Sequence, residues 1–418
     1  AQDFKLTSSG YFKNQGVDVM AFDDIYPEGH QGGVCIIMNG HRVATNGDIR
    51  LEATPGQWQP VPKQLDRKLG DNSITATLCY PDSSRHLTGF NPMIYPDLHL
   101  IYTVNVESKG KNIEVTVDLD RPIPQEFIGK VGFNLEFFPG SLFGKPWIMD
   151  GQSGIFPQQP NSPLMTTQPN YLHTGNYHDG KQSLADMDKL IGKGYSPIVA
   201  DDIISEPYAK GRKFTSRPDD PYNKVTIESL SGDLQLFDGR MNHNNGWFVL
   251  RSNIKPGVTK GAVKWIITPN VVADWMYQPV IQTSQIGYHP AQDKEAVIEM
   301  DIRDNRKETA QIIRIDADGE KVVKNVTPAN WGKFLRYNYL KVDFTDVKEP
   351  GLYKIKYDTS VSPIFRIDND VYARGVWQPV LEYFLPVQMC HMRVNEKYRV
   401  WHDCCHMDDA QMAPAHNH

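Results

Sequence analysis

The sequence lacks any uninterrupted apolar stretch long enough to cross a membrane. A transmembrane helix needs about 20 consecutive apolar residues, and no run in the chain approaches that length. An excess of positive charge is also missing, because 44 Lys and Arg face 50 Asp and Glu and the net charge is −6. Nucleic acids and anionic membranes require clustered Lys and Arg. We therefore expect no transmembrane segment and no nucleic-acid partner.

Cysteine is scarce, with five residues in 418, which is too few for a disulfide-stapled scaffold. Cys35 and Cys79 stand in apolar, strand-like contexts and are expected to be small buried hydrophobic residues. The remaining three, Cys390, Cys404 and Cys405, fall close together near the end of the sequence. This clustering indicates a local chemical role.

The first residue is Ala, followed by Gln, where a primary translation product would begin with Met. A chain numbered from the cleavage point of an export signal begins in this way. We therefore expect an exported protein, periplasmic or extracellular.

Helical periodicity is almost absent from residues 1–275. Segments 99–108 and 112–121 alternate apolar and polar residues on either side of the turn "KGK", which predicts an antiparallel pair of strands. Further strands are expected in "VGFNLEFF", "KVTIESLSGDLQLF", "GWFVLRSNI" and "GAVKWIITP". One short helix is expected at 183–194, with Ser183 as its cap and Gly194 as its stop. More than a dozen short strands predict a large β-sandwich over 1–275.

Residues 137–180 are rich in Pro, Gly and aromatic residues and are expected to form long ordered loops. Loops of this length are often functional. Trp147, Tyr171 and Tyr177 could offer a stacking surface to a sugar ring as a substrate-binding site. The alternative is that these rings pack the loop onto the sandwich.

A second β unit is expected at 279–368. Strands are expected within 281–301, 310–322, 340–357 and 362–368, with "DADG" as a hairpin turn and "EPG" as another. About ninety residues with strands at this spacing are typical of an immunoglobulin-like sandwich.

The periodicity changes at residues 368–390, where apolar residues follow a helical repeat. Asp368 or Asn369 could cap the start of this helix, and Pro379 and Pro386 are expected to kink or break it. A helix after two β units predicts that residues 369–418 begin a third, helical domain.

Three stretches in this order carry a family resemblance: "QTSQIGYHPAQDKEAV", "VDFTDVKEPGLYKIKY" and "SPIFRIDNDVYARGVWQPVLEYFLPVQMC". Over residues 280–418 the chain resembles the N-terminal immunoglobulin-like module of glycoside hydrolase family 9, which is cellulase-like, and the start of that family's catalytic domain. After the large β-sandwich expected over 1–275, which is similar to an extra β domain of some exported members, the resemblance implies an immunoglobulin-like β-sandwich followed by the first helices of an (α/α)6 barrel, and so a mainly β chain. It also implies action on β-1,4-linked glucans or related β-glycans. Hydrolysis would invert the anomeric centre, with an Asp base activating water and a Glu acid protonating the leaving oxygen.

The catalytic motif of that family has the form Gly-Trp-His-Asp-Ala-Gly-Asp-Tyr, and "VWHDCCHMDD" matches it poorly. Trp401, His402 and Asp403 agree, but Cys404 and Cys405 replace Ala-Gly. The stretch "CHMDD" at 405–409 fits better a "CHxxD" pattern that precedes the catalytic motif in the family. We therefore assign no catalytic residue and expect the catalytic carboxylates beyond His418.

The cysteine cluster at the end of the sequence predicts a structural zinc site. Structural zinc takes four Cys, His or carboxylate ligands in a tetrahedron. If "WHDCCHMDDAQM" is helical, Cys405 and Asp409 share one face with His406 beside them, and Cys390 comes from the end of the preceding helix. The family resemblance implies the same four ligands. Reserve ligands are His391, His402, Cys404 and Asp408.

Three alternatives stay open at this point. Export favours oxidation, so Cys390 and Cys405 could instead form a disulfide. The protein could be a non-catalytic carbohydrate-binding or interaction module. A mutarotase-like activity in residues 1–275 would need a His and Glu pair, for which His173, His178 and His243 are available but not selected by their spacing.

Overall fold

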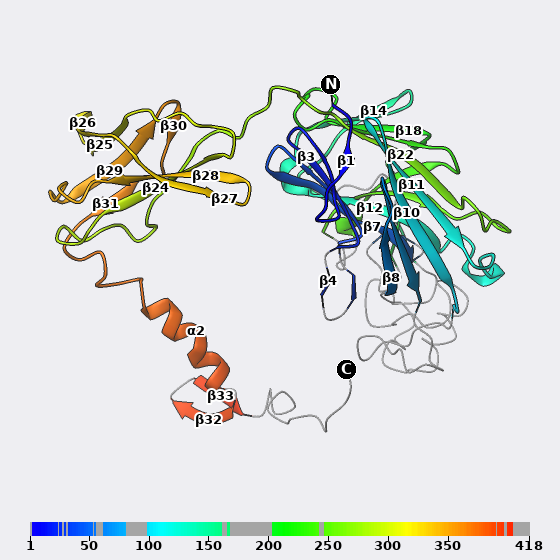
Figure 1. Cartoon of the computed structure of the whole chain (residues 1–418). Helices are drawn as coiled ribbons and strands as arrows, with labels where there is room; N and C mark the ends of the chain where they lie inside the picture. The colour runs from blue at the N-terminus through cyan, green and yellow to red at the C-terminus, as the bar shows by residue number, and fades with distance from the viewer. Residues whose placement is uncertain are drawn as a thin grey trace. The chain divides into compact units, whose positions relative to one another are not determined.

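The computed structural model describes residues 2–23, 25–26, 29–30, 32–52, 54–55, 62–80, 98–160, 165–167, 203–241, 246–389, 391–396 and 399–403. The chain divides into two compact units, Ala1–Trp275 (unit 1) and Met276–His418 (unit 2) (Figure 1). Both units are built mainly of β-strands, as the alternating sequence predicts. In the described part of the chain, no helix is long and apolar enough to cross a membrane.

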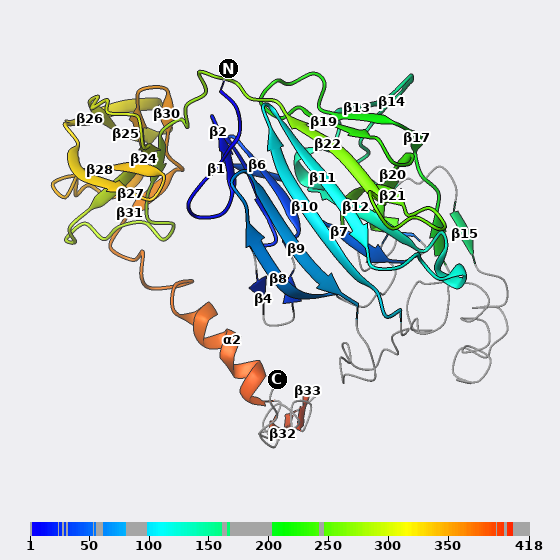
Figure 2. The same ribbon diagram turned by 45° about the vertical axis from the view of Figure 1, so that its right-hand side comes forward.

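Unit 1 contains two nine-stranded sheets. The first sheet has the order β1 (Lys5–Leu6), β2 (Phe12–Asn14), β3 (Val17–Ala21), β6 (Val34–Met38), β7 (His41–Leu51), β12 (Val131–Phe137), β21 (Phe248–Asn253), β20 (Leu234–Asp238) and β17 (Ala209–Gly211). The second has the order β14 (Gln152–Ile155), β13 (Pro146–Met149), β18 (Lys213–Ser216), β19 (Val225–Ser229), β22 (Val263–Pro269), β11 (Asn112–Leu119), β10 (Ile101–Lys109), β9 (Ser73–Cys79) and β8 (Lys63–Leu69). Figure 2 shows β8, β9, β10, β11 and β22 side by side in this second sheet.

Smaller elements accompany the two sheets. They are the pairs β4 (Ile25–Tyr26) with β5 (Gly29–His30) and β15 (Met165–Thr167) with β16 (Ile203–Ser205), and the short 3₁₀ helices η2 (Gln125–Phe127), η3 (Pro139–Ser141) and η5 (Gly239–Met241). The short helix expected at 183–194 lies outside the described residues.

The predicted hairpin of β10 and β11 is confirmed. Val104 pairs with Val117 and Val106 with Val115, so the apolar residues of both strands share one buried face. Gly110 closes the turn with a φ of 63°, a left-handed conformation that glycine adopts without steric cost. The period-two pattern in this stretch therefore fixed both the strands and their register.

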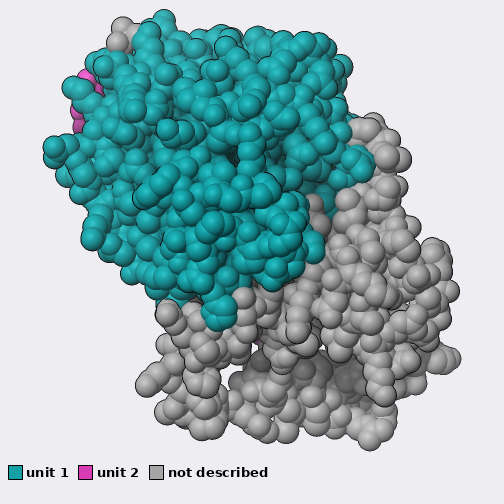
Figure 3. Space-filling view, turned by 90° about the vertical axis from the view of Figure 1, so that its right-hand side faces the viewer, with its two compact units in different colours: residues 1–275 teal, residues 276–418 magenta. Residues whose placement is uncertain are grey.

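The two nine-stranded sheets pack face to face around one hydrophobic core. Phe133 of β12 meets Trp265 of β22 edge to face, with ring centroids 4.8 Å apart. Phe137 of β12 meets Phe214 of β18 in the same way at 5.8 Å. All four rings are almost fully buried, and burial of such a side chain is worth about 1.5 to 3 kcal/mol. Figure 3 shows unit 1 as a closely packed body from one side.

Unit 2 contains a smaller sandwich of two antiparallel sheets. One sheet has the order β23 (Val280–Gln282), β24 (Glu295–Asp301), β28 (Tyr337–Asp343) and β27 (Ala329–Phe334). The other has the order β26 (Gly319–Val326), β25 (Ala310–Asp316), β29 (Gly351–Tyr357) and β30 (Ser360–Val361), with β31 (Phe365–Ile367) also paired to β29. Ile298, Val342 and Ile355 belong to the core between these sheets and are completely buried.

One of the two turns expected in unit 2 is a hairpin and the other is not. "DADG" joins β25 to β26, and Asp316 pairs with Gly319. "EPG" instead links β28 to β29, which belong to different sheets. The reason is that Tyr353 of β29 pairs with Arg314 of β25, so the chain must cross the sandwich after β28.

The helix expected from residue 368 begins ten positions later, as α2 (Gln378–Met389). Gly375, with a φ of 72°, interrupts the helical pattern before this point. Pro379 is the second residue of α2, where a missing N–H costs nothing. The expected break at Pro386 does not occur, since the helix continues to Met389. Among the described residues α2 is the sole α-helix, so the helical barrel stays a prediction.

Two short strands follow α2, namely β32 (His391–Glu396) and β33 (Arg399–Asp403). They form an antiparallel hairpin in which His391 pairs with Asp403. A helix over 401–412, which the zinc argument assumed, is wrong for its first three residues because residues 401–403 are part of β33.

Candidate functional site

The four predicted zinc ligands, Cys390, Cys405, His406 and Asp409, all lie outside the described residues. Among the reserve ligands, the structure places His391 in β32 and His402 in β33, whereas Cys404 and Asp408 lie outside it. Within the described ranges, no group of three or more His, Cys, Asp or Glu side chains could hold a metal ion. The zinc site therefore stays a prediction.

Of the three aromatic residues expected to stack on a sugar, the described part of the chain includes Trp147. Trp147 is in β13 and only 5% exposed, and its ring lies 6.4 Å from that of Tyr208. Gly154 packs directly against the Trp147 indole, since a Cβ at position 154 would lie 2.4 Å from that ring. Trp147 thus packs within the sandwich and offers no free face to a sugar. Tyr171 and Tyr177 lie outside the described residues, as do His173, His178 and His243.

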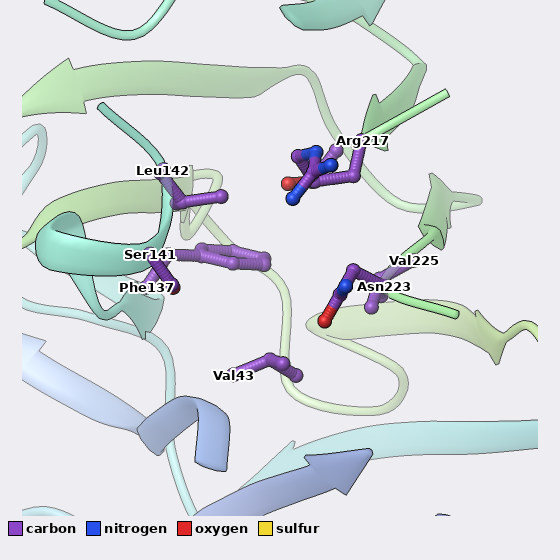
Figure 4. Close-up of a pocket in the computed structure, with 8 residues that line it drawn as sticks. Val43, Phe137, Ser141, Leu142, Arg217, Asn223 and Val225 are labelled. Carbon is purple, nitrogen blue, oxygen red and sulfur yellow. The ribbon is translucent and has the colours of Figure 1, made fainter. Parts of the chain in front are cut away.

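A small pocket lies at one end of the sandwich core, lined by Phe137, Leu142, Arg217, Asn223 and their neighbours (Figure 4). Its volume is about 20 Å³, which is room for one water molecule. Arg217 makes ion pairs with Asp219 and Asp220, both at 3.0 Å. The pocket is too small for a sugar, and its arginine is already neutralised, so we assign it a structural role.

The most unusual chemistry of unit 1 is a group of charged side chains buried on three adjacent strands. We call it the Glu52 cluster, and its members are Asp48 and Arg50 of β7, Glu52 directly after β7, Asn134 and Glu136 of β12, and Arg251 of β21. The register aligns the strands, because Asn134 pairs with Asp48 on one side and with Arg251 on the other. Charged residues are almost never fully buried unless they are paired. The cluster must therefore neutralise itself internally.

Arg251 connects the members of the cluster. Its Nη1 donates to Asn134 Oδ1 at 3.0 Å, and its Nη2 donates to the backbone carbonyl of Glu52 at 2.7 Å. The Glu52 carboxylate lies 3.5 Å from Arg251 Nη1 and accepts a hydrogen bond from Asn134 Nδ2 at 2.8 Å. Arg251 is 1% exposed and Glu52 is 2% exposed, so these contacts operate away from water. Hydrogen bonds to charged groups are worth about 1.5 to 3 kcal/mol each in such surroundings.

Burial changes the acidity of Glu52. It raises the pKa of this carboxyl to about 7, although the nearby guanidinium groups of Arg251 and Arg50 pull it down in part. A carboxyl with this pKa can accept and release a proton near neutral pH, which is the property of many catalytic and binding groups. Among the described acids of unit 1, Glu52 is the one whose pKa is raised into the neutral range.

Two buried donors near Glu52 have no hydrogen-bond acceptor among the described residues. Among the described residues, neither the hydroxyl of Tyr80 nor Nε of Arg50 finds a hydrogen-bond acceptor, and Tyr80 is 2% exposed. Burial, and next the charge of Asp48, raise the pKa of Tyr80 well above its usual range, so its hydroxyl keeps its proton. Buried donors are nearly always satisfied by protein or water. The arrangement could therefore hold a water molecule or an oxygen atom of a small ligand.

A β-bulge shapes this part of β7. Thr45 pairs with Glu136 and Asp48 with Asn134, so β7 carries one extra residue between the two pairs. Asn46 adopts a φ of 56° at this point and donates from Nδ2 to Glu136 Oε2 at 3.0 Å. Gly47 fits closely against Val34, because a Cβ on Gly47 would lie 2.6 Å from the Cβ of Val34. Bulges are frequent next to functional sites, where they redirect a side chain.

Sequence reasoning missed this cluster for a definite reason. The stretch "GDIRLE" alternates charged and apolar residues, and this pattern usually places its charges in water. The signal that could have found it is "TNGD" at 45–48, where an Asn-Gly pair inside a strand pattern indicates a bulge.

Comparison with known proteins identifies one part of the chain. Residues 276–362 match the family model of the cellulase N-terminal ig-like domain. No curated protein matches the chain. A solved structure described as Bacteroides ovatus GH9 is 25% identical over 22% of this chain and 16% of its own length, with a TM-score of 0.19. The Slr1438 protein from Synechocystis sp. PCC 6803 is 12% identical over 62% of this chain and 95% of its own, with a TM-score of 0.27.

Both TM-scores are too low for an argument about fold or function. The family model matches the strands β23 to β30 that build the sandwich of unit 2. The immunoglobulin-like module expected at 279–368 is therefore supported as a cellulase N-terminal ig-like domain over residues 276–362.

Proposed function

We propose that this chain is part of an exported glycoside hydrolase that acts on β-1,4-linked glucans or related β-glycans. The observation that supports this most strongly is the match of residues 276–362 to a domain that is characteristic of cellulases. Two of the three stretches that carry the resemblance to glycoside hydrolase family 9, at 282–297 and 342–357, lie within this match, and the third, at 362–390, begins where it ends.

The helix α2 supports a helical domain after the immunoglobulin-like module. Its residues Leu381, Tyr383 and Phe384 are exposed by 50%, 72% and 55%. A twelve-residue helix with large apolar side chains in water gains little stability on its own. In our proposal, further helices of an (α/α)6 barrel pack against this surface.

Catalysis in this proposal takes place in the helical domain. A Glu acid protonates the leaving oxygen, and an Asp base removes a proton from the attacking water on the opposite face of the sugar. The two carboxyl groups must leave room for that water, so the anomeric centre is inverted. We assign neither role to a described residue, and in particular not to Glu52.

We also propose a structural zinc ion held by Cys390, Cys405, His406 and Asp409. The hairpin of β32 and β33 is consistent with this ligand set, because the pairing of His391 with Asp403 brings its two ends side by side. Thiolate, imidazole and carboxylate are the ligands that zinc prefers, and four protein ligands would leave no open position for catalysis. The ion would fasten the start of the helical domain.

A second candidate function is a non-catalytic carbohydrate-binding module. The specific feature that favours it is a row of partly exposed aromatic side chains on unit 2 that ends at Trp331. A binding module and a hydrolase would both retain a β-glucan, but a binding module would release no sugar from it.

The test is to incubate the protein from its native source with a β-1,4-glucan and with starch, an α-linked glucan of the same sugar. We expect new reducing ends from the β-glucan and none from starch. The absence of reducing ends from every β-glycan, with retention of the protein on the polymer, would replace the hydrolase with the binding module.

A further inference from the structure

Unit 2 carries a row of aromatic side chains on the outer side of its four-stranded sheet. We call this row the aromatic face, and its members are Tyr277, Tyr337, Tyr339 and Trp331, with the carboxylate of Glu299 among them. Consecutive ring centroids in this order are 5.2, 6.1 and 5.6 Å apart. Figure 1 shows β24, β28 and β27, the strands that carry most of the row, side by side.

Strand alternation places these rings away from the core. In β28, Leu340 and Val342 are buried between the two sheets, so Tyr337 and Tyr339 point to the opposite side. Both tyrosines are half-buried. The core of unit 2 therefore does not account for them.

Glu299 fixes two of the rings. The hydroxyl of Tyr277 donates to Glu299 Oε1 at 2.9 Å, and the hydroxyl of Tyr339 donates to Oε2 at 3.3 Å. Burial and the hydrogen bond to Glu299 raise the pKa of Tyr277, so the donor keeps its proton. The row thus combines apolar ring faces with a carboxylate that can accept further hydrogen bonds.

Trp331 stands at the rim of the sheet. It occupies the register shift of edge strand β27, between Asn330 and Gly332, and it meets Tyr339 edge to face at 90°. Its side chain is 55% exposed, and Phe334 of the same strand is 58% exposed. Phe334 pairs with Tyr337 across β27 and β28, and such cross-strand aromatic pairs stabilise a sheet, but about half of the Trp331 side chain still faces water.

We propose that the aromatic face binds a glycan chain, with the exposed Trp331 as the stacking platform and Glu299 as an acceptor for sugar hydroxyl groups. A pyranose ring presents C–H groups on its faces and hydroxyl groups at its edge, so it matches ring faces that alternate with a carboxylate. This inference takes its ligand class, a β-1,4-linked glucan, from the proposed function.

The polar groups around the row favour a glycan over an apolar protein surface. Lys341 and Glu295 form an ion pair at 3.0 Å on the same side of the sheet as Tyr339. An apolar partner would have to take this ion pair out of water, at a desolvation cost that the attraction between the two charges often fails to repay. A neutral glycan can hydrogen-bond to them while they remain in water.

The test is native affinity electrophoresis of the purified protein in gels that contain hydroxyethyl cellulose, for wild type and for Trp331→Ala. We expect the mutation to weaken retention by about tenfold or more, as loss of an exposed aromatic anchor does. Trp377→Ala is the matched control, because Trp377 is 58% exposed in unit 2 and lies outside the aromatic face. We expect Trp377→Ala to change retention by less than about twofold. Tyr339→Phe, which keeps the ring and removes the hydroxyl, should retain most of the binding.

Hydrolysis of cellopentaose, measured in parallel, separates this inference from the proposed function. Loss of retention in Trp331→Ala, with wild-type hydrolysis and an unchanged melting temperature, supports the glycan site. Loss of retention in a protein that hydrolyses nothing supports the site and contradicts the hydrolase. Unchanged retention in Trp331→Ala overturns the inference, as does a change only in the protein's oligomeric state, which would make the face a protein contact.

Discussion

The hydroxyl of Tyr102 on β10 donates a hydrogen bond to Asp48 Oδ1 on β7 at 2.9 Å, and so joins the two large sheets through a polar contact. Tyr102 is 1% exposed and Asp48 is completely buried. The Asp48 carboxylate also accepts a hydrogen bond from the backbone N–H of Ile49, and its Oδ2 lies 3.8 Å from Arg50 Nη1. The Glu52 cluster is therefore connected to both layers of unit 1.

Removal of the Tyr102 hydroxyl should destabilise unit 1. Tyr102→Phe leaves the buried Asp48 carboxylate short of one donor, and we expect a loss of about 1 to 3 kcal/mol in the free energy of unfolding. Urea denaturation of wild type and mutant measures this difference in the free energy of unfolding. Tyr222→Phe is the control, because Tyr222 is 45% exposed, and it should cost almost nothing. Equal stability of the two mutants would show that the contact between the sheets contributes little.

Glu52 should make the stability of unit 1 depend on pH. Its pKa of about 7 in the folded protein exceeds the value of 4.5 in the unfolded chain, so the folded state binds more protons between these values. Stability therefore falls as pH rises from about 4.5 through 7, by an amount on the order of a few kcal/mol. The charges of Arg251 and Arg50 and the hydrogen bond from Asn134 limit the rise in the pKa of Glu52, whereas the charge of Glu136 adds to it.

Melting temperatures between pH 5 and pH 8 test this dependence. Glu52→Gln cannot ionise, and we expect its melting temperature to fall less over this range than that of wild type. Glu107→Gln, on the partly exposed side of β10, serves as the matched control and should follow wild type. Parallel curves for wild type and Glu52→Gln would show that Glu52 is already ionised at pH 5.

The bulge in β7 should tolerate no side chain at Gly47. Gly47→Ala places a Cβ 2.6 Å from the Cβ of Val34, and the strain of such a contact costs about 1 to 3 kcal/mol. Thermal denaturation should show a lower melting temperature for this mutant. Gly151→Ala is a suitable control, since no heavy atom lies within 4 Å of a Cβ at that position. A normal melting temperature for Gly47→Ala would mean that the bulge can relax.

The zinc proposal predicts about one zinc ion per chain, a stoichiometry that four protein ligands would hold through purification. Elemental analysis of the purified protein measures it, and Cys405→Ser should lower the zinc content because a hydroxyl is a poor zinc ligand. Met412→Ala, which lies outside the predicted ligand set, should leave the content unchanged. Mass spectrometry of the unreduced protein that finds Cys390 linked to Cys405, without zinc, would establish the competing disulfide.

The amount that could be predicted from the sequence differs between the parts of the fold. The strands β10 and β11 were predictable because their residues alternate strictly and one face is fully buried. The start of α2 was not, because the apolar spacing continues upstream of Gly375 while the backbone of this glycine adopts a left-handed conformation. Periodicity describes which side chains share a face but not where the backbone leaves the helix.

The sites were harder to predict than the strands. Arg251 and Glu52 are 199 positions apart in sequence, and only the pairing of β7, β12 and β21 brings them together. The aromatic face depends in the same way on the pairing of Tyr339 with Glu299 across β28 and β24. Sequence patterns within one strand carry no information about such neighbours.

The most direct test of the central claim follows the reaction of cellohexaose with the native protein by proton NMR. An inverting β-glycan hydrolase produces the α-anomer first, and the β-anomer then grows in by slow mutarotation. The account predicts this order of appearance. Initial formation of the β-anomer would contradict the inverting mechanism, and unchanged cellohexaose, with other β-glycans equally untouched, would contradict the assignment as a glycoside hydrolase.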